Sequence, residues 1–218
     1  MKIPRSNIAG LLSAIALITI TGCAKYHTKP LPEVFDVNAA TATHVSPVTT
    51  TGTKTVTGYA YELSTQECKH IFSRNAPRKG LRAIHLSIKN DTKTNYLLRG
   101  SNLDIPMVSR YVVGDMLEID VLHRVLGWTV PGLFFWLLLI PAIVEGFGAT
   151  SANRKMMHDL DQRIVDDHTN VVIKPGSVLS RVIFMRHDSF EVAGDTMHMT
   201  LEDIDSTDKR QLSVTIDK

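Results

Sequence analysis

Apolar residues take every second position in several short stretches of this chain. Between Arg82 and Lys89 the apolar residues fall on one face and the polar residues on the other, which predicts a half-buried strand. The sequences Asn90–Lys93 and Pro175–Ser177 are turn-forming and each follows or precedes such a stretch. The pattern predicts strands at Thr55–Leu63, Arg82–Lys89, from Tyr96 to Leu98, and at Val171–Ile173, Val178–Met185, Thr196–Leu201 and Gln211–Ile216.

Helical spacing replaces this alternation in the middle of the chain. Apolar residues in Pro106–Leu126 recur close to the period of a helix, although Gly114 weakens that pattern. Ser151–His168 is the clearer helix, with an apolar stripe on one face and a charged ladder, which we expect to be solvated, on another. The stripe consists of Met156, Met157, Leu160 and Ile164, and the ladder of Lys155, Asp159, Arg163 and Asp167.

The two groups of strands and the helical segment between them predict the fold class. We expect a mainly β (α+β) protein, an immunoglobulin-like or similar β-sandwich, closed by residues from both ends of the chain. The expected arrangement is a single β-rich domain over residues 55–218 with an apolar helical insertion at about residues 106–168. A length of 218 residues suits one domain of ordinary size.

The insertion contains an unusually apolar stretch, Trp128–Phe147. Its twenty residues include one charged side chain and both tryptophans, and prolines and glycines interrupt it. Three structures remain open: a membrane-spanning helix, a buried core element, or a hairpin whose exposed tip contacts lipid or other copies of the chain. The residues expected to make such contacts are Trp128, Phe134, Phe135 and Trp136.

The N-terminus has the organisation of a secretory signal peptide. Two positive charges precede the 13-residue apolar stretch Ile8–Ile20, which is shorter than the roughly 20 residues of a spanning helix. Ile20-Thr21-Gly22-Cys23 then resembles the lipobox of bacterial lipoproteins. The resemblance implies removal of residues 1–22 and attachment of fatty chains to Cys23. An ordinary signal peptide or an uncleaved anchor is the alternative.

The resemblance also implies a location. In enterobacterial lipoproteins an aspartate after the cysteine retains the protein in the inner membrane, whereas this chain has Ala24, which implies the outer membrane, with the protein facing the periplasm. Residues 23–54 are rich in threonine, proline and alanine and are expected to form the lipidated cysteine and a flexible tether. Fully extended, the 31 residues from Ala24 to Lys54 would reach roughly 100 Å.

Charge and cysteine content narrow the possible partners. The chain has 24 basic and 22 acidic residues, and loss of Lys2 and Arg5 with the signal peptide would leave 22 of each. This balance argues against nucleic acid as a partner. With Cys23 acylated, Cys68 would be the single remaining thiol, and we expect it to be a buried small residue rather than a redox site.

Searches for a catalytic or metal site give no candidate. The nine histidines lack the spacing of zinc sites, and on a strand Met197 and Met199 would face away from His198, which argues against a copper site. Acidic pairs such as Asp166-Asp167 and Glu202-Asp203 are interpreted as solvated. We therefore expect no catalytic residue, no metal and no cofactor.

The function expected from the sequence is that of a non-enzymatic envelope lipoprotein, anchored to a lipid bilayer through Cys23. It would act as a structural or assembly component, with copies of itself or an envelope protein complex as partners. The alternative is a periplasmic carrier or binding protein for a small apolar ligand lodged against the insertion.

Overall fold

The computed structural model describes residues 26–31, 55–123, 125–126, 139–188, 196–206 and 208–217. Its contacts divide the chain into two compact units. One unit, Thr28–Leu117 with Asp159–Lys218, contains all the described strands and is called the β unit below. The other, residues 1–27 with Glu118–His158, has helices among its described residues and is called the helical unit.

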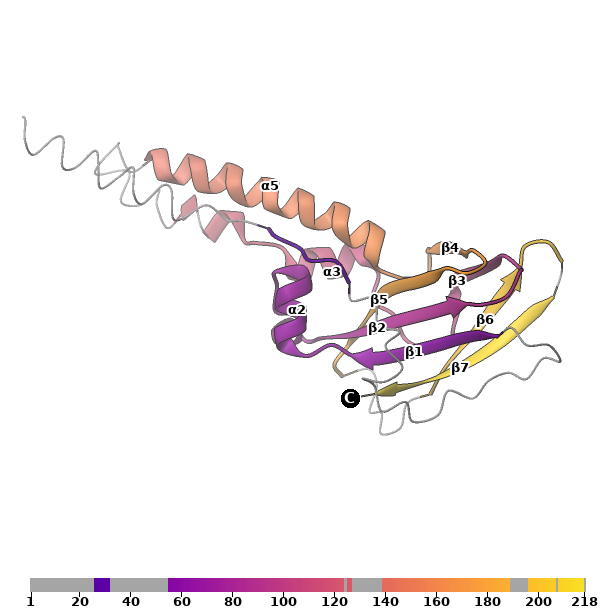
Figure 1. Ribbon diagram of the computed structural model, residues 1–218. Helices are drawn as coiled ribbons and strands as arrows, with labels where there is room; N and C mark the ends of the chain where they lie inside the picture. Colours follow the sequence, from indigo (N-terminus) through magenta and orange to yellow (C-terminus); the bar gives the residue numbers. More distant parts are fainter. Residues whose placement is uncertain are drawn as a thin grey trace, which may run out of the picture. The chain divides into compact units, whose positions relative to one another are not determined.

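Seven strands of the β unit form one mixed sheet that curls nearly into a barrel (Figure 1). Neighbouring strands follow the order β4-β3-β6-β7-β1-β2-β5, in which β1 and β7 run parallel and every other pair is antiparallel. The expected β-rich fold class is confirmed. The strands are β1 (Val56–Glu62), β2 (Leu81–Asn90), β3 (Tyr96–Leu103), β4 (Asn170–Ile173), β5 (Val178–Arg186), β6 (Thr196–Asp203) and β7 (Lys209–Asp217).

One apolar core fills the concave side of this sheet. The apolar face predicted for β2 is confirmed, because Ile84, Leu86 and Ile88 all belong to the core. The prediction that this strand is half-buried was wrong, because its other face is buried as well. Met197 and Met199 of β6 join them while His198 between them is exposed, as the strand pattern predicted. Burial of residues from all seven strands in one cluster is the main apolar stabilisation of the β unit.

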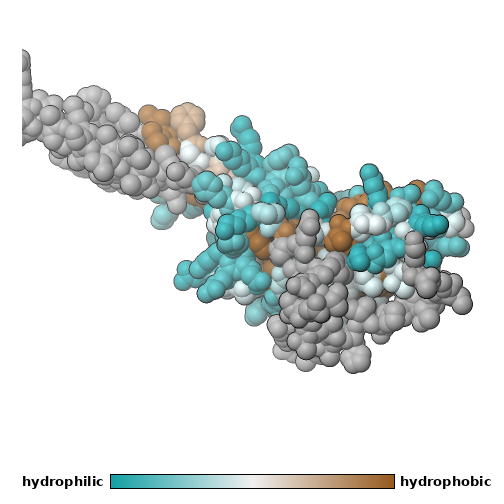
Figure 2. Space-filling model, in the orientation of Figure 1, coloured by the Kyte–Doolittle hydropathy of each residue, from teal (hydrophilic) through white to brown (hydrophobic). Residues whose placement is uncertain are grey.

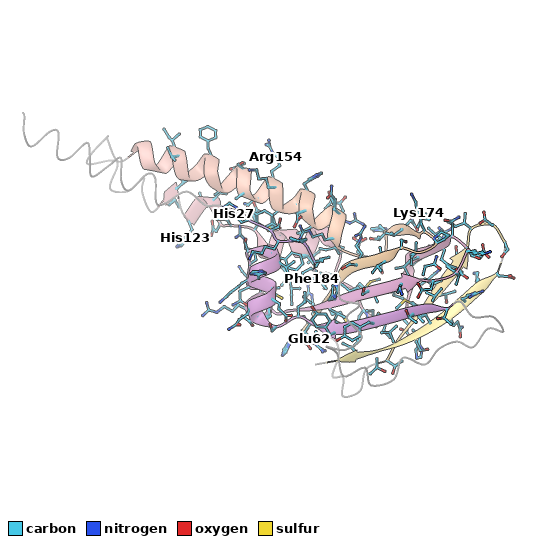
Figure 3. All side chains as sticks on the ribbon, viewed as in Figure 1. His27, Glu62, His123, Arg154, Lys174 and Phe184 are labelled. Carbon is cyan, nitrogen blue, oxygen red and sulfur yellow. The ribbon has the colours of Figure 1, made fainter. Side chains whose placement is uncertain are left out.

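Helix α2 (Thr65–Phe72) packs against the convex side of the sheet at β5. The apolar pattern of the sequence did not predict this helix. Ser64 caps this helix through a reciprocal pair of hydrogen bonds with Glu67. The ring centroids of Phe72 and of Phe184 on β5, which Figure 3 labels, are 5.4 Å apart. As a result β5 is buried on both faces over Val182–Met185. Two further elements of this unit are the 3-10 turn Pro77–Lys79 and helix α3 (Arg110–Leu117).

The segment from Ile164 to Thr169 connects the two edges of the curled sheet. At one end the Val165 amide donates to the Val182 carbonyl of β5, and at the other the Gly100 amide of β3 donates to the Thr169 carbonyl. Gly100 lies so close to this segment that a Cβ there would be 1.7 Å from the Asp166 carbonyl oxygen. Only glycine fits at this point.

The helical unit contains most of α5 (Leu139–Arg163), whose residues from Asp159 onward belong to the β unit. Residues 121–123 and 125–126 are also helical. The expected helices at Pro106–Leu126 and Ser151–His168 are thus present with different limits: α3 ends at Leu117, and α5 begins earlier and ends earlier than predicted. Among the described residues, no helix is both long and apolar enough to cross a membrane.

Apolar side chains of the helical unit are exposed. Ile143 and Phe147 of α5 are 57% and 75% exposed, and Leu122 and Leu126 are 68% and 47% exposed. Figure 2 shows hydrophobic residues gathered at the N-terminal end of α5. In the part of Trp128–Phe147 that the structure describes, these values favour an exposed surface over a buried core element.

Candidate functional site

A buried ion pair holds the start of α3 to the segment that joins the sheet edges. Arg110 donates from Nε (2.9 Å) and Nη2 (2.6 Å) to the two carboxylate oxygens of Asp166. Its Nη2 also reaches the Thr169 hydroxyl at 3.0 Å, and its Nη1 lies 3.6 Å from Asp161. The interpretation of Asp166 as a solvated residue was therefore wrong, because its side chain is 1% exposed.

Hydrogen bonds keep this buried carboxylate charged. Burial by itself would raise the pKa of Asp166, but hydrogen bonds from the Arg110 guanidinium, the Thr169 hydroxyl and the Arg110 amide outweigh it and hold that pKa well below the ordinary range. The hydrogen bond to Asp166 in turn raises the pKa of Arg110. The pair is thus ionised at every physiological pH, and its role is to fix the backbone around it.

Beside this ion pair lies a groove of about 770 Å³. Its polar lining includes Arg110, Arg163, Arg181, His168 and Asn170, and its apolar lining comes from residues such as Leu31, Ile164 and Val171. The size lies within the range of small-molecule sites, roughly 300–1,000 Å³. Three arginines in one groove suit a polar ligand better than a purely apolar one.

The chain just after the expected lipidation site contacts the β unit at this groove. Arg163 donates from Nη1 to the Lys29 carbonyl at 2.6 Å, while its Nε forms an ion pair of 2.7 Å with Asp159. Pro30 and Leu31 then line the groove. Arg163 and Asp159 are 17% and 15% exposed, so they are more buried than the solvated ladder predicted from the sequence.

A histidine and a serine meet on the convex side of the sheet. His85 Nε2 lies 2.7 Å from the Ser180 hydroxyl, and the Tyr61 ring packs edge-on against His85. Burial lowers the pKa of His85 to about 4, against a smaller opposing effect of Glu67. His85 is 0% exposed, and its Nδ1 has no hydrogen-bond partner among the described atoms. A nucleophilic serine needs a base oriented by a third group and open to substrate, so we assign this pair a structural role.

The residues singled out from the sequence are divided between described and undescribed parts of the chain. Cys23 and the expected contact residues Trp128, Phe134, Phe135 and Trp136 all lie outside the described residues. Cys68 is described and is fully buried in α2, as expected, where burial raises the pKa of its thiol to about 12. In the described part of the chain, no three His, Cys, Asp or Glu side chains gather as metal ligands would.

Sequence reasoning missed Arg110, Arg181 and Gly100. A signal was available for one of them, because Arg181 interrupts the apolar residues of a strand that is buried on both faces over Val182–Met185. The partners of Arg110 lie 51 and 56 positions away, and no local pattern identifies such a pair. Searches against protein-family models, curated proteins and solved structures found no match to this chain.

Proposed function

We propose that this chain is a non-enzymatic envelope lipoprotein, anchored in the bacterial outer membrane by fatty chains on Cys23 and facing the periplasm. Its role is structural, as a component that assembles with a protein partner through the helical unit. The resemblance of Ile20–Cys23 to a lipobox supports the anchor. An immunoglobulin-like sandwich for the β unit stays a prediction.

The exposed apolar residues of the helical unit are the observation that carries the assembly role. Ile143 and Phe147 of α5 are spaced i,i+4, so they project from one side of that helix. Leu122 and Leu126 have the same spacing in the sequence, and both are exposed. Exposed apolar surface of this kind usually marks an interface. Spacing by helical turns suits another helix as the partner, and the simplest such helix is the same segment of a second copy.

The alternative function, a periplasmic carrier or binding protein for a small apolar ligand, receives less support. The groove in the β unit is lined by three arginines, and its walls are only partly apolar. A carrier of apolar ligands would instead need a mainly apolar, enclosed pocket.

Site-specific photocrosslinking in intact cells tests the assembly role. A photoreactive residue at Phe147 should give crosslinks to a second copy or to another envelope protein. The same residue at Arg154, which is exposed farther along α5, is the matched control and should give few. Equal crosslinking from both positions, or crosslinks to lipid alone, would contradict a protein interface.

The anchor is tested separately. Mass measurement of the processed N-terminus should show an acylated cysteine at position 23, and Cys23→Ser protein should be released from membranes. A bare thiol at the N-terminus would remove the anchor and leave the interface test unaffected.

A further inference from the structure

Arg181 occupies a position in β5 that the sheet would normally fill with an apolar residue. In the β2–β5 ladder, Ile84 lies opposite Ile183, Leu86 opposite Arg181, and Ile88 opposite Leu179. Directly opposed residues of an antiparallel pair point to the same face. The four isoleucines and leucines of the flanking pairs, and Leu86 itself, belong to the core. Arg181 therefore projects from the core-facing side of the sheet, near its edge.

The charges around the groove leave Arg181 without a counter-ion among the described residues. Asp166 and Asp161 are both paired with Arg110, and Asp159 is paired with Arg163. Within the described part of the chain, the one side-chain hydrogen bond of Arg181 runs from Nη1 to the Ser180 carbonyl at 3.0 Å. Burial lowers the pKa of Arg181, which is the mark of a cation losing water without gaining a charged partner.

We propose that the groove binds a small organic anion whose carboxylate or phosphate group pairs with the Arg181 guanidinium. A guanidinium presents a planar pair of donors that matches either oxyanion with two parallel hydrogen bonds. The Asn170 side chain lines the same groove and can add a neutral hydrogen bond, while Leu31 and Val171 offer apolar contact to the body of the ligand. This ligand site is independent of the proposed assembly role, because it lies wholly within the β unit.

Ligand titration of the full chain by calorimetry tests the site, with inorganic phosphate and succinate as probes. Arg181→Met should weaken binding of the preferred probe at least tenfold, since it removes the charge and keeps much of the apolar stem. Lys174→Met is the matched control, because Lys174 is an exposed cation in the turn between β4 and β5 (Figure 3). It should bind as the unaltered chain does. Preference for succinate would identify a carboxylate ligand, and preference for phosphate a phosphorylated one.

The same variants separate specific binding from general salt effects. Phosphate stabilises most folded proteins through exclusion from their surface, so a rise in the unfolding temperature alone is not enough. Specific binding requires that the probe raise the unfolding temperature of the unaltered chain and of Lys174→Met, but not that of Arg181→Met, at equal ionic strength. The proposal is overturned if both variants respond equally, or if neither probe binds the unaltered chain. Circular dichroism of Arg181→Met verifies that the variant is folded.

Discussion

Gly100 is the residue at which β3 and the Asp166–Thr169 segment approach most closely. A Cβ there would lie 1.7 Å from the Asp166 carbonyl oxygen, an atom of the backbone that cannot move without disturbing the Arg110–Asp166 pair. Gly58 is also crowded, but its nearest neighbours are side-chain methyl groups of Val214 and Leu212 at 2.7 and 2.8 Å. Side chains can rotate away, whereas a hydrogen-bonded backbone cannot.

Replacing each glycine by alanine should therefore have unequal effects. Overpacking typically costs 1–3 kcal/mol, so we expect Gly58→Ala to fall within about that range and Gly100→Ala to exceed about 3 kcal/mol. Urea unfolding followed by circular dichroism measures both. Similar losses for the two variants would contradict the close approach at Gly100.

His85 makes stability depend on pH in a defined window. Its pKa is about 4 in the folded protein because of burial, whereas an unfolded histidine has a pKa of 6.5. Between these two values His85 is protonated in the unfolded chain and neutral in the folded chain. The free energy of unfolding therefore falls as the pH is lowered from 6.5 to 4. The loss should approach about 3 kcal/mol, at 1.36 kcal/mol per pKa unit.

Unfolding measured at steps between pH 7 and pH 4.5 checks this slope. His85→Gln keeps a side chain that can hydrogen-bond to Ser180 but does not titrate, and should show a shallower dependence. Asp166 acts in a different window: its lowered pKa stabilises the fold above about pH 4, the unfolded value, and that contribution is lost only at more acidic pH. If His85→Gln has the slope of the unaltered chain, another group is responsible.

At the scale of elements, the strands could be predicted because the sheet has one continuous apolar face. Alternation identified β2 almost to its ends, and the turn at Pro175–Ser177 separated β4 from β5. The concave core therefore followed from the sequence. The burial of His85 and Ser87 on the other face did not, since polar residues at alternate positions indicate solvent.

The helices were harder to predict for reasons that differ between them. Helix α2 has only eight residues, too few for a convincing period, although the capping-box sequence from Ser64 to Glu67 marks its start. Helix α5 ends at Arg163 rather than at His168 because Ile164 leaves the helix to pair with Val182. A long-range strand contact overrides local helix propensity there, and it also creates the groove that local patterns could not predict.

At the scale of the whole molecule, the two units treat apolar residues differently. The β unit has one large apolar core and also exposes some large hydrophobic residues, such as Tyr111 and Val172. The described helices of the helical unit expose four, Leu122, Leu126, Ile143 and Phe147. The chain passes between the units three times, at His27–Thr28, at Leu117–Glu118 and at His158–Asp159. The two proposals therefore assign different roles to the two units: ligand recognition to the β unit and assembly to the helical unit.

The contact between Arg163 and the Lys29 carbonyl bears on how far the β unit can move from a membrane. A free tether of residues 24–54 would reach roughly 100 Å. If Lys29 is held on the β unit, only the five residues 24–28 lie between Cys23 and that contact, and these six residue steps reach roughly 20 Å. The β unit of an anchored chain should then stay close to the bilayer surface.

Energy transfer on vesicles tests this short tether. A donor dye on Lys174→Cys would report its distance from acceptor lipids, because the other expected free thiol, Cys68, is buried. Arg163→Met should lower transfer by releasing Lys29, whereas Arg154→Met on the same helix should not. Insertion of ten flexible residues after Ala24 shows how much energy transfer falls when the tether is lengthened by a known amount. If the insertion lowers energy transfer but Arg163→Met does not, the contact between Arg163 and Lys29 does not hold the tether. If neither change lowers energy transfer, Cys23 is not the point of attachment.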